Sequence, residues 1–320
     1  MKRKITFILI LLILLTACNK NSLAEYKKAA EKTAGIRRGQ TAGEFILTTE
    51  INPHGLTAEE IKELNYIKDM EGSFSVVYDD ELGKRAIRNY LNFGGLGYDF
   101  EVFIEGDQML IKLPIVGKYL KIEERAREDL QSENPFISQQ TIDELTKKWL
   151  TLMNEEDVFR GKAIVLTTPD GEVKTREYTI KLNDQQIKTL LEEAAEILVK
   201  DKKLKNFYEE NTRANTEDLY TTSFEEFLAS ILKAAEKFKV QDFSFTAYVD
   251  IDGYIVNQVL EISLKTIEQK EGIVGFNYYL DIKNWDINKD QNFDFPLLTE
   301  ENTIQIDDMD VDIPANFIKN

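Results

Sequence analysis

Alternation of apolar and polar positions marks two parts of the chain, residues 72–122 and residues 241–283. In the second part, for example, polar residues separate Phe243, Phe245 and Ala247. A period of two with one polar face is typical of a half-exposed antiparallel strand. The turns between these strands are only a few residues long, and connections this short join antiparallel neighbours. The pattern therefore predicts antiparallel meanders towards both ends of the chain.

Helical spacing of apolar residues replaces this alternation in the middle of the chain. It predicts helices over about 139–153, 183–198 and 223–239, with a hairpin over 158–182 between the first two. Residues 200–220 are rich in charge and are the least core-like part of the chain. The last helix has the most apolar stripe, which consists of Phe224, Phe227, Leu228, Ile231, Leu232, Ala235 and Phe238.

The elements thus follow in the order strands, helices, strands. Nothing between them resembles a linker, which indicates a single domain over residues 41–320. We expect an α+β fold in which both ends of the chain contribute to one curved antiparallel sheet. The helices between them would then cover one face of that sheet.

The first eighteen residues differ from all the others. Lys2, Arg3 and Lys4 precede an apolar run over residues 5–15. This is the layout of a secretory signal, and the run is too short for a transmembrane helix, which needs about 20 apolar residues. The residues Leu15-Thr16-Ala17-Cys18 also match the lipobox of bacterial lipoproteins. The alternative is an ordinary secretory signal in which the cysteine occurs by chance.

The lipobox predicts a lipoprotein signal peptide over residues 1–17 and a diacylglycerol on Cys18. Residues 18–40 would then form a lipidated tether with a short helix. We expect an extracytoplasmic protein that is anchored to the bacterial cell membrane by the lipid on Cys18.

Charge and cysteine content narrow the function further. Loss of residues 1–17 removes three basic residues and changes the formal net charge from −17 to −20. Such an acidic chain is unsuited to nucleic acid and to electrostatic binding of anionic lipids, so the lipid anchor should be the membrane contact. Cys18 is the only cysteine, which excludes disulfides, zinc–cysteine sites and a second, nucleophilic thiol. We expect no cofactor, and the protein partner is left open.

Candidate catalytic and metal-binding residues are sparse. His54 is the only histidine and lies in a Pro-His-Gly turn, which favours an exposed turn residue over a catalytic one. Asp286, Asn288 and Asp290 have the spacing of a calcium loop. Gln291 replaces the glycine at the sixth position, and Leu297 replaces the glutamate at the twelfth. We therefore expect no metal site and no enzyme.

Two segments resemble the LolA-like lipoprotein carriers and the LppX-like lipoproteins. One is residues 97–121, with a hairpin at Glu105-Gly106-Asp107, and the other is residues 250–298, with Asn284-Trp285-Asp286 and Phe295-Pro296-Leu297. The motifs are turns and strand ends. The resemblance implies a half-open barrel with helices covering its concave face, often around an apolar groove for acyl chains. It brings no catalytic residues.

These observations give two main hypotheses for function, and a hydrolase with an unrecognised site is the third. The first is a membrane-anchored, non-enzymatic lipoprotein that binds lipid or another apolar ligand in a half-barrel groove, with Phe224, Phe227, Leu228, Ile231 and Phe238 as candidate groove lining. The second is an envelope sensor or protein-interaction module with a packed scaffold and an acidic surface. A groove lining and a core lining have the same composition, so the sequence leaves both open.

Overall fold

The computed structural model describes residues 21–106, 108–112, 114, 116–122, 137–213, 222–268 and 271–305. The predicted signal peptide and the lipidation site Cys18 therefore lie outside the described residues. None of the described helices is long and apolar enough to cross a membrane.

Strands predominate towards both ends of the described chain, and most of the helices lie in the middle. The helices are α2 (Ser22–Ala34), α3 (Ala58–Tyr66), α4 (Gln139–Leu152), α5 (Asp184–Leu198), α6 (Lys202–Arg213) and α7 (Phe224–Ala235), with a short 3₁₀ turn, η3 (Glu155–Asp157). The strands are β1 (Arg38–Asn52), β2 (Asp69–Asp79), β3 (Lys84–Phe93), β4 (Leu96–Glu105), β5 (Gln108–Lys112), β6 (Tyr119–Ile122), β7 (Val158–Thr168), β8 (Gly171–Ile180), β9 (Phe238–Asp250), β10 (Ile255–Thr266), β11 (Gly272–Trp285) and β12 (Thr303–Gln305).

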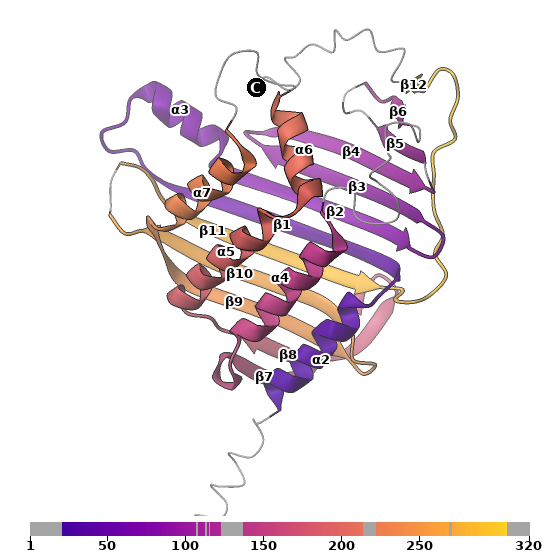
Figure 1. Cartoon of the computed structure of the whole chain (residues 1–320), viewed down its shortest axis with the longest axis horizontal. Helices are drawn as coiled ribbons and strands as arrows, with labels where there is room; N and C mark the ends of the chain where they lie inside the picture. Colours follow the sequence, from indigo (N-terminus) through magenta and orange to yellow (C-terminus); the bar gives the residue numbers. More distant parts are fainter. Residues whose placement is uncertain are drawn as a thin grey trace, which may run out of the picture.

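All these strands belong to one curved, unclosed sheet in the order β12-β6-β5-β4-β3-β2-β1-β11-β10-β9-β8-β7. Neighbouring strands are antiparallel, except that β12 is parallel to β6. Next to the middle of the sheet β1 pairs with β11, so strands from the two ends of the chain meet there (Figure 1). The α+β class and the sheet built from both ends are confirmed.

Local sequence signals define many of the element boundaries. Thr57, Asn183 and Ser223 each begin a helix with a capping box, in which the side chain accepts a hydrogen bond from the backbone N–H three residues later. Gly94 and Gly95 both have positive φ and make the two-residue turn between β3 and β4. The caps at Asn183 and Ser223 begin the helices that the sequence predicts from residues 183 and 223.

The core lies between the helices and the β7–β10 part of the sheet. Tyr26 of α2 is 2% exposed, and its hydroxyl accepts a hydrogen bond from Trp149 Nε1 of α4 at 2.8 Å. Both side chains pack against Phe245 of β9. The helix in the predicted tether region is therefore longer than expected and is part of the core.

Three features of the fold differ from the sequence prediction. Helix α6 occupies most of the described part of residues 200–220, where the charged composition gave no sign of it. Strand β12 was not expected. Helix α7 ends at Ala235, so Phe238 is not on its stripe but begins β9, where it pairs with Thr266 and its ring lies 5.3 Å from that of Phe276. Pairing with β10 outweighs the helical spacing at this residue.

Candidate functional site

The register of the sheet shows which side chains share the face with the helices. One row of directly paired residues crosses the sheet through Phe245, Leu260, Leu280, Phe45, Gly72, Leu91 and Tyr98. Phe245 and Leu260 pack against the core beneath α2 and α4. The whole row therefore lies on the helix side, because alternate residues of a strand point to opposite faces.

Burial divides this face into two regions. On the β7–β10 side the helices bury it, as shown by Ile180 and Ala247, which are both 0% exposed. On the β1–β5 side most apolar residues keep part of their surface in contact with solvent, and Phe100 is 39% exposed. We call this region the open apolar face; it comprises Phe45, Leu47, Phe74, Val76, Ile87, Leu91, Phe100, Val102 and Ile111. Only at its far end are Ile104 and Met109 buried.

Two glycines flatten the centre of the open apolar face. Gly43 pairs with Phe74, and Gly72 pairs with Phe45. A Cβ atom at Gly43 would come within 2.6 Å of the Phe74 ring, and one at Gly72 within 2.5 Å of the Phe45 ring. Each ring thus lies flat against the sheet, over the glycine of the neighbouring strand. The face is therefore lower here than it would be if larger side chains were paired at these positions.

One polar residue lies in the middle of this face. Asn89 pairs with Phe74 on one side and with Phe100 on the other, and Ile87 and Leu91 flank it along β3. Its side chain is half-buried and forms no hydrogen bond with another described residue. An amide in this position offers hydrogen bonds to whatever covers the face.

The structure separates the candidate groove residues of the sequence. Phe224 and Leu228 of α7 are 3% and 9% exposed, as expected for core, whereas Phe227 and Ile231 are 39% and 44% exposed. Phe227 stacks on Tyr208 of α6, with 5.0 Å between ring centroids, and Phe238 is in β9 on the sheet. In Figure 1, α6 and α7 lie on the same side of the sheet as α4 and α5.

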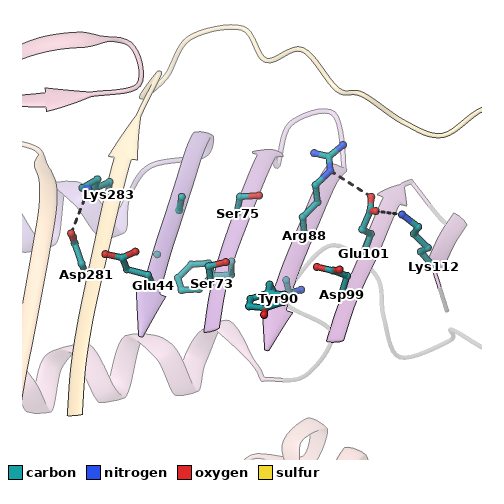
Figure 2. A pocket seen from close by; sticks show the side chains of 14 residues that line it. Glu44, Ser73, Ser75, Arg88, Tyr90, Asp99, Glu101, Lys112, Asp281 and Lys283 are labelled. Carbon is teal, nitrogen blue, oxygen red and sulfur yellow. Dashed lines mark hydrogen bonds and ion pairs between the residues drawn. The ribbon is translucent and has the colours of Figure 1, made fainter. Parts of the chain in front are cut away.

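Part of the opposite face of β1–β5 and β11 is polar, although Ala86 and Phe103 on that face are buried. Two rows of directly paired side chains cross it, one formed by Lys283, Ala42, Ser75, Arg88, Glu101 and Lys112, the other by Asp281, Glu44, Ser73, Tyr90 and Asp99. They line an open depression of about 620 Å³, which we call the polar trough. Figure 2 shows that Ser73 and Ser75 lie between two groups of charged side chains (Figure 2).

Ion pairs hold the basic groups of the trough in place. Glu101 accepts from Lys112 Nζ at 2.5 Å and lies 3.5 Å from Arg88 Nε, while Lys283 Nζ lies 3.4 Å from Asp281. The hydrogen bond to Glu101 raises the pKa of Lys112 above its usual value. Two carboxylates of the second row, Glu44 and Asp99, form no hydrogen bond or ion pair with another described residue.

Two tyrosines extend the same polar face beyond the trough. Burial, together with the nearby carboxylates of Asp281, Glu44 and Glu261, raises the pKa of Tyr279. Burial and neighbouring carboxylates, Glu177 first, also raise the pKa of Tyr248. Both phenols therefore remain protonated over the physiological pH range and act as hydrogen-bond donors.

The calcium-like spacing does not bring its side chains together. Asp286 accepts from Lys289 Nζ at 2.9 Å, Asn288 donates to the Tyr254 hydroxyl at 3.0 Å, and Asp290 pairs with Arg38 at 3.1 Å. No group of three or more His, Cys, Asp or Glu in the described ranges is arranged to hold a metal ion. His54 is exposed in its turn, where its backbone N–H donates to Asn52.

The polar trough was not among the sequence predictions. The sequence analysis identifies these strands by their apolar residues, whereas the trough consists of the polar residues between them. Without the register, these polar residues resemble an ordinary solvent-exposed strand face. Only cross-strand pairing shows that the small Ala42, Ser73 and Ser75 are neighbours and leave a hollow between longer side chains.

Comparison with known proteins adds no functional assignment. No family model matches the sequence, and no curated protein matches it. Among solved structures, an N-terminal dehydratase from the difficidin assembly line has 10% identity over 84% of this chain and 83% of that chain, with a TM-score of 0.15. The dehydratase domain of RzxB from Pseudomonas fluorescens has 7% identity over 77% of this chain and 76% of that chain, with a TM-score of 0.09. Such low scores carry no argument about fold or activity.

Proposed function

We propose that the protein is a non-enzymatic bacterial lipoprotein, anchored to the cell membrane through Cys18, that binds the acyl chain of a lipid on its open apolar face. In this proposal the helices cover the concave face of a half-open barrel, and the ligand lies between them and β1–β5. The observation that supports it is the contrast within one sheet face, where the β7–β10 side is buried and the β1–β5 side is apolar but partly exposed.

The energy available from such binding is substantial. Each buried methylene contributes about 0.8 kcal/mol, so a chain that buries ten of them gains roughly 8 kcal/mol before the entropy lost on binding is subtracted. A soluble protein rarely leaves a contiguous apolar surface of this kind open unless it serves binding. The flat floor made by the Phe45 and Phe74 rings suits a long, thin ligand.

The short connection to the anchor favours direct exchange with the membrane. Three residues separate Cys18 from Ser22, the first residue of α2. Four Cα–Cα steps span at most about 15 Å. Because α2 is part of the core, the lipid on Cys18 would hold the whole domain close to the bilayer surface.

The test is whether the protein retains lipid. Residues 19–320, which include every described residue but no anchor of their own, should co-purify with lipid that organic extraction and mass spectrometry detect. Val76→Trp should reduce this lipid strongly, because it puts a large side chain on the open apolar face. Val165→Trp is the matched control, since Val165 lies on the edge strand β7 and is 56% exposed.

The contrary result is equally clear. If residues 19–320 fold but carry no lipid and take up none from vesicles, the open apolar face does not bind lipid. The interaction-module hypothesis would then be the better one.

A further inference from the structure

The polar trough is a hollow with a defined construction. Its floor is formed by small residues, Ala42, Ser73 and Ser75 on β1 and β2. Charged side chains from β11 stand along one side, and charged side chains from β3, β4 and β5 stand along the other (Figure 2). Neighbouring strands are about 4.8 Å apart, so the six strands from β11 to β5 span roughly 24 Å. The trough is therefore long, shallow and open along its length.

The side chains of the polar trough that have no hydrogen-bond partner in the described part of the chain determine which kind of ligand fits. Arg88, Lys112 and Lys283 are engaged by Glu101 and Asp281, which leaves the trough without a free cation among the described residues. The carboxylates of Glu44 and Asp99 form no hydrogen bond with another described residue. The same is true of the hydroxyls of Ser73, Ser75 and Tyr90. Carboxylates only accept hydrogen bonds, so a matching ligand must be rich in donors. An anionic ligand would be repelled.

Tyr90 adds an apolar platform to this set. Its hydroxyl and ring edge lie over Gly97 of β4, where an added Cβ would come within 2.9 Å of the hydroxyl oxygen. The side chain thus lies along the sheet rather than standing away from it, and it remains 37% exposed. Its paired neighbours on the adjacent strands are Ser73 and Asp99. Aromatic faces of this kind pack against the C–H surfaces of ligands while the polar rim makes hydrogen bonds.

We propose that the polar trough binds a short, uncharged oligosaccharide. A sugar chain presents hydroxyl donors along its length and C–H faces that pack on an aromatic ring, which are the two properties that the available groups require. A diamine would also supply donors to Glu44 and Asp99. Exposed ion pairs add little to binding, however, and a flexible diamine loses conformational freedom, so a stiffer chain with many hydrogen bonds fits better. This proposal is independent of lipid binding, because the trough and the open apolar face are on opposite sides of the sheet.

The experiment uses the full chain, purified from membranes in detergent. Maltotetraose and tetra-N-acetylchitotetraose serve as neutral probes, putrescine as the cationic probe, and saturation-transfer NMR as the readout. At least one tetrasaccharide should receive saturation, with an affinity that changes little between low and high salt because no net charge is paired. Tyr90→Ala should weaken this binding roughly tenfold. Tyr66→Ala, at another exposed tyrosine outside the trough, should leave it unchanged.

A second variant guards against misfolding of the first. Ser75→Leu fills the floor of the trough on a strand face that is already partly exposed, and it should abolish the saccharide signal while circular dichroism remains that of the wild type. The proposal is wrong if neither tetrasaccharide receives saturation, or if the signal persists in Ser75→Leu. It is also wrong if putrescine alone binds and salt removes that binding.

Discussion

The ring of Phe74 lies directly over Gly43 on the neighbouring strand, so close that a Cβ atom there would be 2.6 Å from two ring carbons. The carbonyl oxygen of Asp281 limits the same space from the other side, at 3.0 Å. Glycine at this position thus makes room for a close approach within a regular strand, and any larger residue must displace the Phe74 ring.

We predict that Gly43→Ala destabilises the protein by about 1–3 kcal/mol, the usual cost of overpacking. The added methyl group forces the Phe74 ring away from the sheet and into the space above the open apolar face. Lipid retention should fall together with the unfolding free energy measured in urea. Gly39→Ala on the same strand is the control, because a Cβ there meets nothing nearer than 3.4 Å.

A double-mutant cycle isolates the contact between these two residues. Phe74→Leu removes the ring that Gly43→Ala displaces, so the double variant should be more stable than the sum of the two single changes implies. Coupling between touching residues is typically 0.5–3 kcal/mol in magnitude, roughly the range expected here. Strict additivity would show that the ring does not depend on the glycine.

A second prediction concerns Asp201, which is 4% exposed and links the starts of two helices. It accepts hydrogen bonds from the backbone N–H and hydroxyl of Ser138, before α4, and from the backbone N–H of Leu204 in α6. Burial acts to raise its pKa, but these hydrogen bonds and one from Thr141 outweigh burial and lower the pKa from 3.8 to about 2.

The pH dependence follows from the sign of this shift. Because the folded-state pKa lies below the unfolded one, the ionised carboxylate stabilises the fold by about 2 kcal/mol above pH 4, and this contribution is lost as the pH falls from about 4 to about 2. Asp201→Asn should therefore lower the unfolding free energy at pH 7 and much less near pH 2. Asp252→Asn, at an exposed residue, should show no such difference.

A third prediction tests the anchor. In cells, Cys18→Ser should abolish labelling by palmitate and leave the precursor unprocessed, because the modified thiol is the attachment point of the lipid. Several acyl chains at about 0.8 kcal/mol per buried methylene hold a protein on a bilayer, whereas a bare N-terminus does not. A wild-type protein that is soluble and unlabelled would contradict the lipoprotein assignment.

The sequence predicts the strands and most helices well because their signals are local. The Asn183 cap, the Gly94-Gly95 turn and the alternation along β9 each lie within a few residues of what they specify. The prediction that Phe238 belongs to a helix is wrong for the opposite reason. Its strand conformation depends on pairing with Thr266, which is distant in the sequence. Local spacing does not contain that pairing.

The candidate sites are harder to predict because each depends on register. Whether the stripe of α7 is core or groove is decided by neighbours such as Tyr208, which buries one side of Phe224 and stacks on Phe227. The open apolar face and the polar trough alternate along the same strands, so a shift of one residue would exchange them. The sequence shows the alternation but not which residues meet across it.

The last prediction concerns Asn89, the polar residue in the middle of the open apolar face. Phe74 and Phe100 flank it on the neighbouring strands, and its amide has no partner among the described residues. Replacing an unpaired, half-buried polar group by an apolar one of similar size is neutral or stabilising by up to roughly 1 kcal/mol. Asn89→Leu should therefore keep or raise the unfolding free energy.

Asn89→Leu should weaken the binding of ester lipids even though it does not destabilise the fold. If the amide binds the ester carbonyl of a bound lipid, Asn89→Leu should release ester lipids more readily while a plain hydrocarbon probe binds as well as before or better. Residues 19–320 loaded with vesicle phospholipid or with hexadecane, and analysed by mass spectrometry, provide both measurements. Asn92→Leu, on the polar face of the same strand where Asn92 donates to Glu71, is the matched control and should change neither. Equal retention of phospholipid by the wild type and Asn89→Leu would leave the amide without a part in binding, although the face itself could still hold lipid.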